Sequence, residues 1–444
     1  MKKRFGVLIR LGAALAVTTT LVSPTIVAAF TPSVTSYTTT SSYVSGLVAG
    51  PDGNMWYSSR AGGKVGKVTL GGTVTEYATP SSSDTPSITT GPDGNLWFVE
   101  YSNNKVGKVT TSGSFTEYTI PTSSSSPYRI VAGPDGNMWY LGTDSNKIGK
   151  VTTSGSFTEY TIPTSSSNPQ GLAVGPDNNL WFTETTPGKI GKITTSGTIT
   201  EYSLTSGINP TAIAAGPDGN LWFGTNGDNK VGKITTAGTS TLYSVSASVE
   251  GIGVGPDNLV WFSLMSGANN IGSITADGTV TEYPLTGDPY SFAVVLRPDN
   301  NLWVPDYAST GKVVKVAFPP KPGLPATKNV TVEAGKSLRI DVLAGISGNP
   351  DPATLSIVNG PSHGTAVLGS ITYTPTAGYT GTDSLTYQVC STDYNKMCSQ
   401  TVLGISVVGT LADTGQSWLP SLWASVSLVA ITTFLYIKSR RSAA

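Results

Sequence analysis

The phrase AGPDGNMWY occupies residues 49–57, and it returns unchanged at residues 132–140. Close variants of this phrase recur at intervals of about forty residues, and each variant contains a tryptophan. The seven tryptophans of the pattern are Trp56, Trp97, Trp139, Trp181, Trp222, Trp261 and Trp303. A repeat of this length that is rich in short strands and turns is typical of the blades of a β-propeller.

The turn before each tryptophan has a local physical explanation. Pro51 fixes φ at the first turn position, and the Asp52 side chain caps the turn. The next residue must tolerate a left-handed backbone, and only glycine and asparagine occur there. These residues are Gly53, Gly94, Gly136, Asn178, Gly219, Asn258 and Asn300. The repeated phrase is therefore predicted to be scaffold, on the propeller face that lies away from any ligand.

Each copy of the repeat reads as four short strands, as the fourth copy illustrates. Residues 171–174 (GLAV) are small and apolar, which suits a first strand beside the crowded central axis. Residues 179–184 (NLWFTE) alternate like a half-buried second strand. The third and fourth strands are expected at residues 188–195 (GKIGKITT) and 198–204 (TITEYSL).

A tyrosine of the fourth strand indicates how the ring closes. It recurs seven times, but its first copy precedes the first repeat tryptophan: Tyr37, Tyr77, Tyr118, Tyr160, Tyr202, Tyr243 and Tyr283. The last copy of the repeat ends at residues 311–318 and runs into prolines without a fourth strand. Residues 33–39 (SVTSYTT) are therefore expected to supply the outer strand of the last blade, which removes two open sheet edges.

These phrases resemble the streptogramin (virginiamycin B) lyase family of seven-bladed propellers. The matching stretches are GPDGNLWFVE (91–100), NKIGKVTTSGSFTEYTIP (146–163) and NNLWFTE (178–184). The resemblance covers residues 31–318, and we expect the propeller to occupy residues 30–318. It implies a carbon–oxygen lyase in which histidine acts as acid and base while magnesium polarises the substrate.

The histidine content argues against carrying this activity over. The single histidine of the chain, His363, lies beyond the propeller segment. Glu100 or Glu184 would act as a base only with a raised pKa. We therefore name no catalytic residue, expect no required cofactor, and predict a non-catalytic binding or adhesion module. The lyase reaction and a purely structural wall spacer are the alternatives.

Candidate binding residues follow from propeller geometry, because ligands commonly meet the face where first strands begin and second strands end. The residues three positions after each repeat tryptophan are Ser59, Glu100, Gly142, Glu184, Thr225, Leu264 and Asp306. The residues before the first strands include Tyr43, Tyr128, Arg129, Gln170, Glu250 and Tyr290. The candidates for a glycan, peptide or protein ligand are Glu100, Glu184, Asp306, Arg129, Tyr128, Glu250 and Tyr290. Of these, the acids Glu100, Glu184 and Asp306 are also candidates for Mg²⁺ or Ca²⁺, and the alternative is a solvated channel opening.

A second domain is expected after a proline-rich linker at residues 319–327. Residues 328–409 read as short strands of an Ig-like β-sandwich. The stretch GPSHGTAVLGSITYTPTAGYTGTDSLTYQVC (360–390) resembles the Ig-like, cadherin-like modules of bacterial surface proteins. Cys390 and Cys398 flank the turn of an expected hairpin, and in an exported chain they are predicted to form a disulfide.

Both ends of the chain carry processing signals. Residues 1–29 have basic residues, then an apolar run, then small residues before Phe30, which predicts a secretory signal peptide; an uncleaved membrane anchor is the alternative. Residues 418–437 carry no charge and are long enough for a transmembrane helix. Residues 438–444 form a basic tail, which is expected to stay in the cytoplasm.

A short motif precedes this span, and the three parts together resemble the cell-wall sorting signal of Gram-positive surface proteins. The motif is Leu411, Ala412, Asp413, Thr414 and Gly415. The resemblance implies cleavage after Thr414 by a sortase and linkage to peptidoglycan, with the membrane as a partner before sorting. A plain single-pass anchor is the alternative. Only 12% of residues are charged and the net charge is zero, so nothing favours a nucleic-acid partner.

Overall fold

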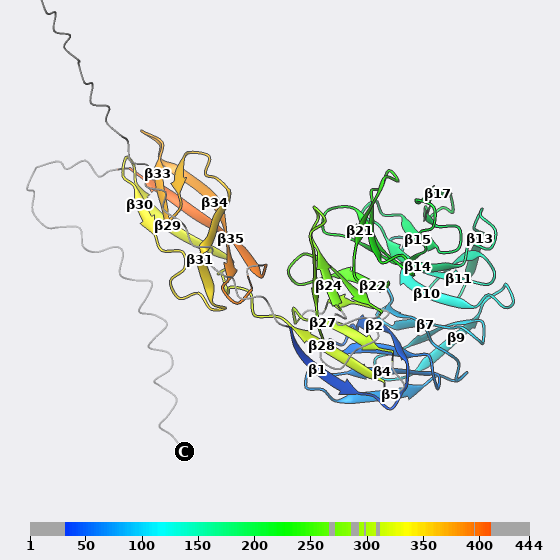
Figure 1. Ribbon diagram of the computed structural model, residues 1–444. Coiled ribbons are helices and arrows are strands. Elements are labelled where there is room, and N and C mark those ends of the chain that lie inside the picture. Colours follow the sequence, from blue (N-terminus) through cyan, green and yellow to red (C-terminus); the bar gives the residue numbers. More distant parts are fainter. Residues whose placement is uncertain are drawn as a thin grey trace, which may run out of the picture. The chain divides into compact units, whose positions relative to one another are not determined.

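The computed structural model describes residues 32–265, 271–285, 293–296, 299–307, 311–394 and 396–409. Within these ranges every regular element is a β-strand, which confirms the all-β fold class (Figure 1). A search of the same ranges for a helix long and apolar enough to cross a bilayer finds none. The predicted signal peptide, sorting motif and transmembrane helix all lie outside the described residues.

The chain divides into two compact units. The first contains the residues up to Leu324 together with Leu343–Ser356 and Gln388–Gln400. The second contains Pro325–Val342, Ile357–Tyr387 and the residues from Thr401 onward. The propeller strands all belong to the first unit.

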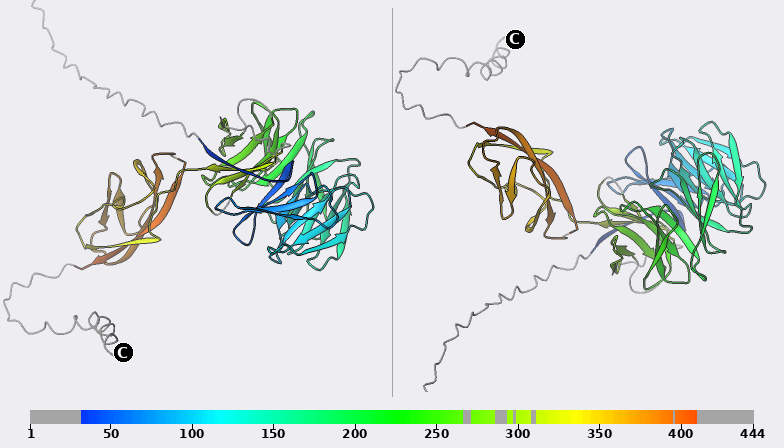
Figure 2. Two further views of the ribbon diagram at one scale, coloured as in Figure 1. Left: turned by 90° about the horizontal axis from the view of Figure 1, so that it is seen from below. Right: turned by 90° about the horizontal axis from the view of Figure 1, so that it is seen from above.

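Seven four-stranded antiparallel sheets make up the propeller in the described part of the chain (Figures 1 and 2). Blade 1 contains β2 (Val44–Ala49), β3 (Met55–Ser59), β4 (Lys64–Val68) and β5 (Val74–Ala78). Blade 2 contains β6 (Ile88–Thr90), β7 (Leu96–Glu100), β8 (Lys105–Val109) and β9 (Phe115–Thr119). Blade 3 contains β10 (Pro127–Ala132), β11 (Met138–Gly142), β12 (Lys147–Val151) and β13 (Phe157–Thr161). Blade 4 contains β14 (Pro169–Val174), β15 (Leu180–Glu184), β16 (Lys189–Ile193) and β17 (Ile199–Ser203). Blade 5 contains β18 (Pro210–Ala215), β19 (Leu221–Thr225), β20 (Lys230–Ile234) and β21 (Ser240–Ser244). Blade 6 contains β22 (Val249–Val254), β23 (Val260–Leu264), β24 (Ile271–Ile274) and β25 (Val280–Tyr283).

The seventh blade closes the ring with both ends of the propeller chain. It contains β26 (Val295–Leu296), β27 (Leu302–Asp306), β28 (Lys312–Ala317) and, as its outer strand, β1 (Ser33–Thr38). The inner strand of each blade contacts the inner strand of the next, and the cycle returns from β26 to β2. The Tyr37 ring stacks on Trp303 with 5.4 Å between the ring centres, so the last blade repeats the tyrosine–tryptophan contact of the others.

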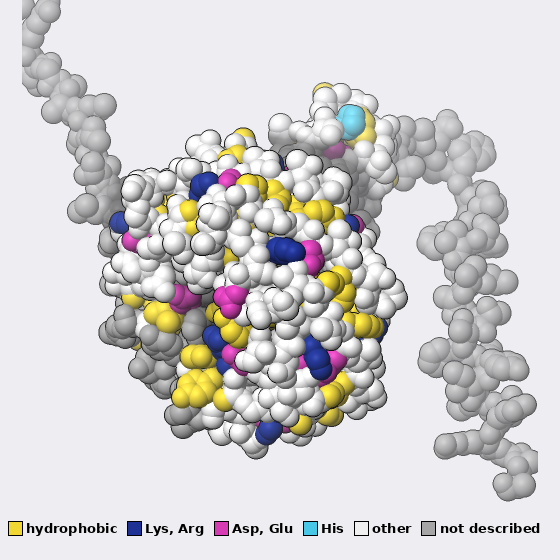
Figure 3. Space-filling view, turned by 90° about the vertical axis from the view of Figure 1, so that its right-hand side faces the viewer, with side chains coloured by type: hydrophobic (Ala, Val, Ile, Leu, Met, Phe, Trp, Pro, Cys, Tyr) yellow, Lys and Arg dark blue, Asp and Glu magenta, His cyan; other side chains and the backbone are white. Residues whose placement is uncertain are grey.

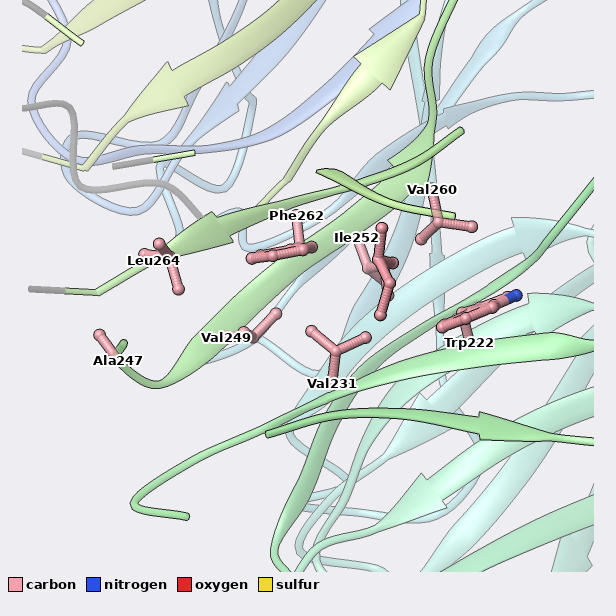
Figure 4. Close-up of a cluster of buried hydrophobic side chains, with 9 residues drawn as sticks. Trp222, Val231, Ala247, Val249, Ile252, Val260, Phe262 and Leu264 are labelled. Atoms are coloured by element: carbon pink, nitrogen blue, oxygen red, sulfur yellow. The ribbon is translucent and has the colours of Figure 1, made fainter. Parts of the chain in front are cut away.

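The repeat tryptophans pack between neighbouring blades. Trp222 of blade 5 lies in a buried cluster with Val249, Ile252 and Phe262 of blade 6 (Figure 4). In the preceding turn, the residue after the aspartate has positive φ in every copy, and Asn178 illustrates this with φ of 56°. The turn phrase is therefore part of the scaffold, because it orients the tryptophan side chain toward the next blade.

The lysines of the third strands make contacts within their own blade and with the next one. In blade 4, Lys189 Nζ donates to Glu201 Oε2 of the fourth strand at 2.9 Å. Lys192 Nζ lies 5.2 Å from the centre of the Trp181 ring and donates to the carbonyl of Thr236 in the next repeat. A Cβ on Gly191, between the lysines, would lie 2.0 Å from the Phe182 ring, so glycine is required there. The lysines therefore have partners within the fold.

The Ig-like domain consists of two sheets. One has the order β29 (Thr327–Glu333), β35 (Cys398–Val408), β34 (Gly381–Ser391), β31 (Pro350–Asn359), and the other has the order β30 (Leu338–Ile340), β33 (Ile371–Pro375), β32 (Gly364–Val367). Residues 364–375 form the hairpin β32–β33. The predicted disulfide between Cys390 and Cys398 is present.

Candidate ligand-binding site at the channel mouth

The inner strands surround a central cavity of about 260 Å³. One apolar side chain from each blade lines this cavity and forms what we call the apolar ring. Its members are Leu47, Ile88, Ile130, Leu172, Ile213, Ile252 and Val294. All seven are buried, so the waist of the channel is narrow and apolar.

The position just before the apolar ring is small in six blades. The six small residues at this position are Gly46, Ser87, Gly171, Ala212, Gly251 and Ala293. The inner strands crowd this position, because a Cβ on Gly171 would lie 2.3 Å from the carbonyl oxygen of Thr211 in the next blade. Blade 3 alone carries a long side chain there, Arg129, which lines the cavity. Arg129 is therefore the one position of this set at which the chain departs from the small residues of the repeat.

Glu250 accompanies Arg129 from another blade. It lies on β22, is 7% exposed, and accepts a hydrogen bond from Asn226 Nδ2 at 2.9 Å. Burial raises the pKa of the Glu250 carboxyl to about 7, although Arg129 and the Asn226 hydrogen bond act to lower it. A group with this pKa can hold or release a proton near neutral pH.

Four half-buried side chains beside the channel form a tyrosine–arginine cluster: Arg60, Tyr101, Tyr128 and Arg129. The Tyr101 and Tyr128 rings meet edge to face, with centres 6.5 Å apart. The Arg60 guanidinium lies 5.6 Å from the Tyr128 ring centre, and that of Arg129 lies 5.4 Å from it. Arg60 also binds the Asp84 carboxylate, with 3.1 Å between Nη2 and Oδ2.

Backbone pairing explains why these side chains share one end of the propeller. The amide of Tyr101, four residues after its tryptophan, donates to the carbonyl of Asp84, which precedes the inner strand of that blade. The amide of Arg60 donates in the same way to the carbonyl of Tyr43. The Tyr43 ring in turn lies 5.1 Å from that of Tyr307. The ends of second strands and the starts of inner strands therefore meet at the channel mouth.

The sequence predicts a mixed ring of acids, aromatics and one arginine at the mouth, but three of its acids are buried. The side chains of Glu100, Glu184 and Asp306 are 0%, 0% and 2% exposed, so they lie inside the protein. Within the described ranges, no three His, Cys, Asp or Glu side chains come together in a group that could hold a metal ion. Tyr290, another candidate, lies outside the described residues. Arg129 lines the central cavity, Tyr128 lies beside the Arg129 guanidinium, and Glu250 interacts with the Arg129 charge.

The residues four positions after the tryptophans, which include Arg60, Tyr101, Asn226 and Tyr307, were not among the predicted candidates. In each blade the second strand ends at the residue three positions after its tryptophan, and that last residue is buried between blades. The residue at four is the first one beyond the strand end, so the length of the strand was the available signal.

The buried glutamates Glu100 and Glu184 occur in two blades that have phenylalanine where blades 1 and 3 have tyrosine. In blade 1, Tyr57 follows the tryptophan, and its hydroxyl donates to Glu76 of the fourth strand at 2.7 Å. In blade 4 the equivalent ring is Phe182, and Glu184 lies two residues further on the same side of the strand. Burial and the nearby charge of Glu201 raise the pKa of Glu184 to about 7. The pKa of Glu100 is raised too, by burial and then by Glu117.

The face of the propeller seen in Figure 3 has no large patch of one charge sign. On the face shown in Figure 3, acidic and basic side chains lie near one another, and large areas carry neither. This agrees with a formal net charge of zero.

Together, the seven sheets and the cavity between their inner strands define a seven-bladed β-propeller with a central channel. Its family follows from comparison with known sequences. The model of the virginiamycin B lyase family matches residues 9–248 and 130–318, and the chain belongs to this family. The bacterial Ig domain model matches residues 320–405.

Solved structures agree with this assignment. A streptogramin B lyase is 33% identical over 64% of this chain and 97% of its own, with a TM-score of 0.61. The virginiamycin B lyase from Staphylococcus aureus was solved as a catalytically inactive histidine-to-alanine variant with quinupristin. It is 31% identical over 65% of this chain and 99% of its own, with a TM-score of 0.61. A search of the curated proteins gave no match.

Proposed function

We propose that this protein binds an extracellular ligand at its channel mouth, without the lyase reaction, as a module displayed on the cell surface of a Gram-positive bacterium. The observation that carries the proposal is the histidine content. Residues 9–318, which match the family model, contain no histidine. In the solved relative from Staphylococcus aureus, the variant in which one histidine is replaced by alanine is described as catalytically inactive.

The chemistry of the mouth supports binding. Tyr101 and Tyr128 offer aromatic surface, while Arg129 and Glu250 place charged groups beside a cavity of about 260 Å³. This volume lies just below the range for ligand sites, about 300–1,000 Å³. A ligand of several rings would therefore rest on the tyrosine–arginine cluster and place only one group in the channel.

The sequence signals at the two ends support surface display. The predicted signal peptide at residues 1–29 and the LADTG motif at residues 411–415 favour export followed by sortase linkage to peptidoglycan. The disulfide between Cys390 and Cys398 also favours export, since disulfides persist in oxidising compartments. The propeller would then face the medium, where it meets glycans, peptides or proteins.

The first test is whether the protein opens a streptogramin B ring. Purified protein incubated with a streptogramin B and Mg²⁺ is expected to leave the ring intact by mass spectrometry, because the propeller lacks the histidine acid and base. The lyase from Staphylococcus aureus is the positive control. Glu250 is the group at the mouth best suited to act as a base, since its pKa is raised to about 7. Ring opening that Glu250→Gln abolishes would establish the lyase alternative.

A second test separates a binding module from a wall spacer. The protein is expected to retain ligands on glycan or peptide arrays, and its deletion is expected to reduce adhesion of the cells. If no ligand is retained and adhesion is unchanged, the spacer alternative holds instead.

A further inference from the structure

We propose that the channel mouth binds an acidic saccharide, with a sugar ring against Tyr101 and Tyr128 and the sugar carboxylate bound by Arg129. This inference rests on the proposed function and specifies the chemistry of its ligand. The proposed ligand is a glycan that carries a carboxylate. The test below therefore also includes a neutral glycan and a glycan with a different anionic group.

The aromatic part of the site is built and held in place. Tyr101 and Tyr128 are half-buried and meet edge to face at 6.5 Å, so their orientations are fixed before any ligand arrives. Arg60 packs against both rings at 6.0 and 5.6 Å, and Asp84 holds its guanidinium. Rigid aromatic surface with few polar groups suits the apolar face of a sugar ring.

The charged part of the site is Arg129. Its planar guanidinium can bind a carboxylate through two parallel hydrogen bonds, a geometry that a lysine would not provide. It lies 5.4 Å from the Tyr128 ring, so one ligand can touch both residues. The small residues at the equivalent positions of the other six blades leave Arg129 as the one cation that this ring of positions contributes to the cavity.

Glu250 lets Arg129 accept a carboxylate from outside. The positive charge of Arg129 attracts the Glu250 carboxylate and lowers its pKa. Glu250 also accepts a hydrogen bond from Asn226 Nδ2. Its pKa of about 7 means that it can become neutral near physiological pH and keep the Asn226 hydrogen bond. A ligand carboxylate can then take the place of the Glu250 charge beside Arg129 without a net change of buried charge.

The test compares two matched tetrasaccharides by isothermal titration calorimetry on the purified full chain. One alternates glucuronic acid with N-acetylglucosamine, and the other contains N-acetylglucosamine alone. The acidic tetrasaccharide is expected to bind at least about tenfold more tightly, because hydrogen bonds between an arginine and a carboxylate are stronger than those between neutral groups. A sulfated tetrasaccharide tests whether any anion suffices.

Three variants and one control assign the contacts. Arg129→Gln is expected to lose the preference for the acidic ligand, Tyr128→Ala to weaken both ligands, and Glu250→Gln to tighten the acidic one because it removes a competing carboxylate. Arg339→Gln, at an exposed arginine on β30, is the matched control and is expected to leave binding unchanged. Melting temperatures establish that each variant is folded.

Each contrary result has a distinct meaning. Equal affinity for the two tetrasaccharides, an unaffected Arg129→Gln variant, or tighter binding of the sulfated ligand would overturn the carboxylate assignment. If neither carbohydrate binds, the saccharide inference fails as a whole. The proposed function itself fails only if the streptogramin ring is opened, or if the arrays and adhesion measurements reveal no ligand.

Discussion

Replacing Trp181 with alanine is expected to lower the free energy of unfolding of the propeller by about 3–5 kcal/mol. Trp181 is fully buried and packs against Ile213, Leu221 and Phe223 of the next blade, so its removal leaves a cavity between two blades. Its indole Nε1 also donates to Asp177 at 2.9 Å, and alanine would leave that carboxylate without this donor. The loss of packing and the lost hydrogen bond act in the same direction.

Urea unfolding followed by circular dichroism measures this effect. Trp181→Phe keeps most of the packing and removes the hydrogen bond, so a smaller loss of about 1–3 kcal/mol is expected. Leu70→Ala is the matched control, since Leu70 is 61% exposed and its truncation should change stability by less than about 0.5 kcal/mol. If Trp181→Ala cost no more than this control, packing of the repeat tryptophan between blades would not stabilise the ring.

The repeat made the fold predictable from sequence. The tryptophan spacing predicts seven blades, and the turn before each tryptophan needs glycine or asparagine because its backbone is left-handed, as at Gly53 and Asn178. The early position of Tyr37 indicates that the chain ends must pair. Each of these signals is a local requirement that recurs seven times, so an error in one copy does not hide the pattern.

The site was harder to predict because it depends on positions where the repeat is irregular. The inner strands contain register shifts, such as the one between Pro127 and Arg129, so simple alternation does not tell which side chains face the channel. Burial was also inaccessible from sequence. Glu100 and Glu184 were predicted at the channel mouth because second strands end there, yet both are buried within their blades.

Glu184 is expected to make the stability of the propeller depend on pH. Its carboxylate oxygens are buried and have no hydrogen-bond partner among the described residues, and its pKa is raised from 4.5 to about 7. The folded state therefore keeps a proton on Glu184 at pH values where the unfolded chain has released it. Stability from this group is fully present below about pH 4.5, falls as the pH rises toward 7, and is lost above that value.

Glu184→Gln replaces the carboxyl with a neutral group of similar shape and is expected to remove this dependence. At about pH 8 the variant should be more stable than the parent by about 1–3 kcal/mol, because it avoids an ionised carboxylate beside Glu201. At about pH 4.5 the two proteins should be equally stable, since Glu184 is then protonated when folded. Urea midpoints across this pH range provide the measurement, with Glu333→Gln as the control at an exposed ion pair with Lys336. A Glu184→Gln variant less stable than the parent at pH 8 would mean that the ionised carboxylate has a favourable partner, and the raised pKa would then be wrong.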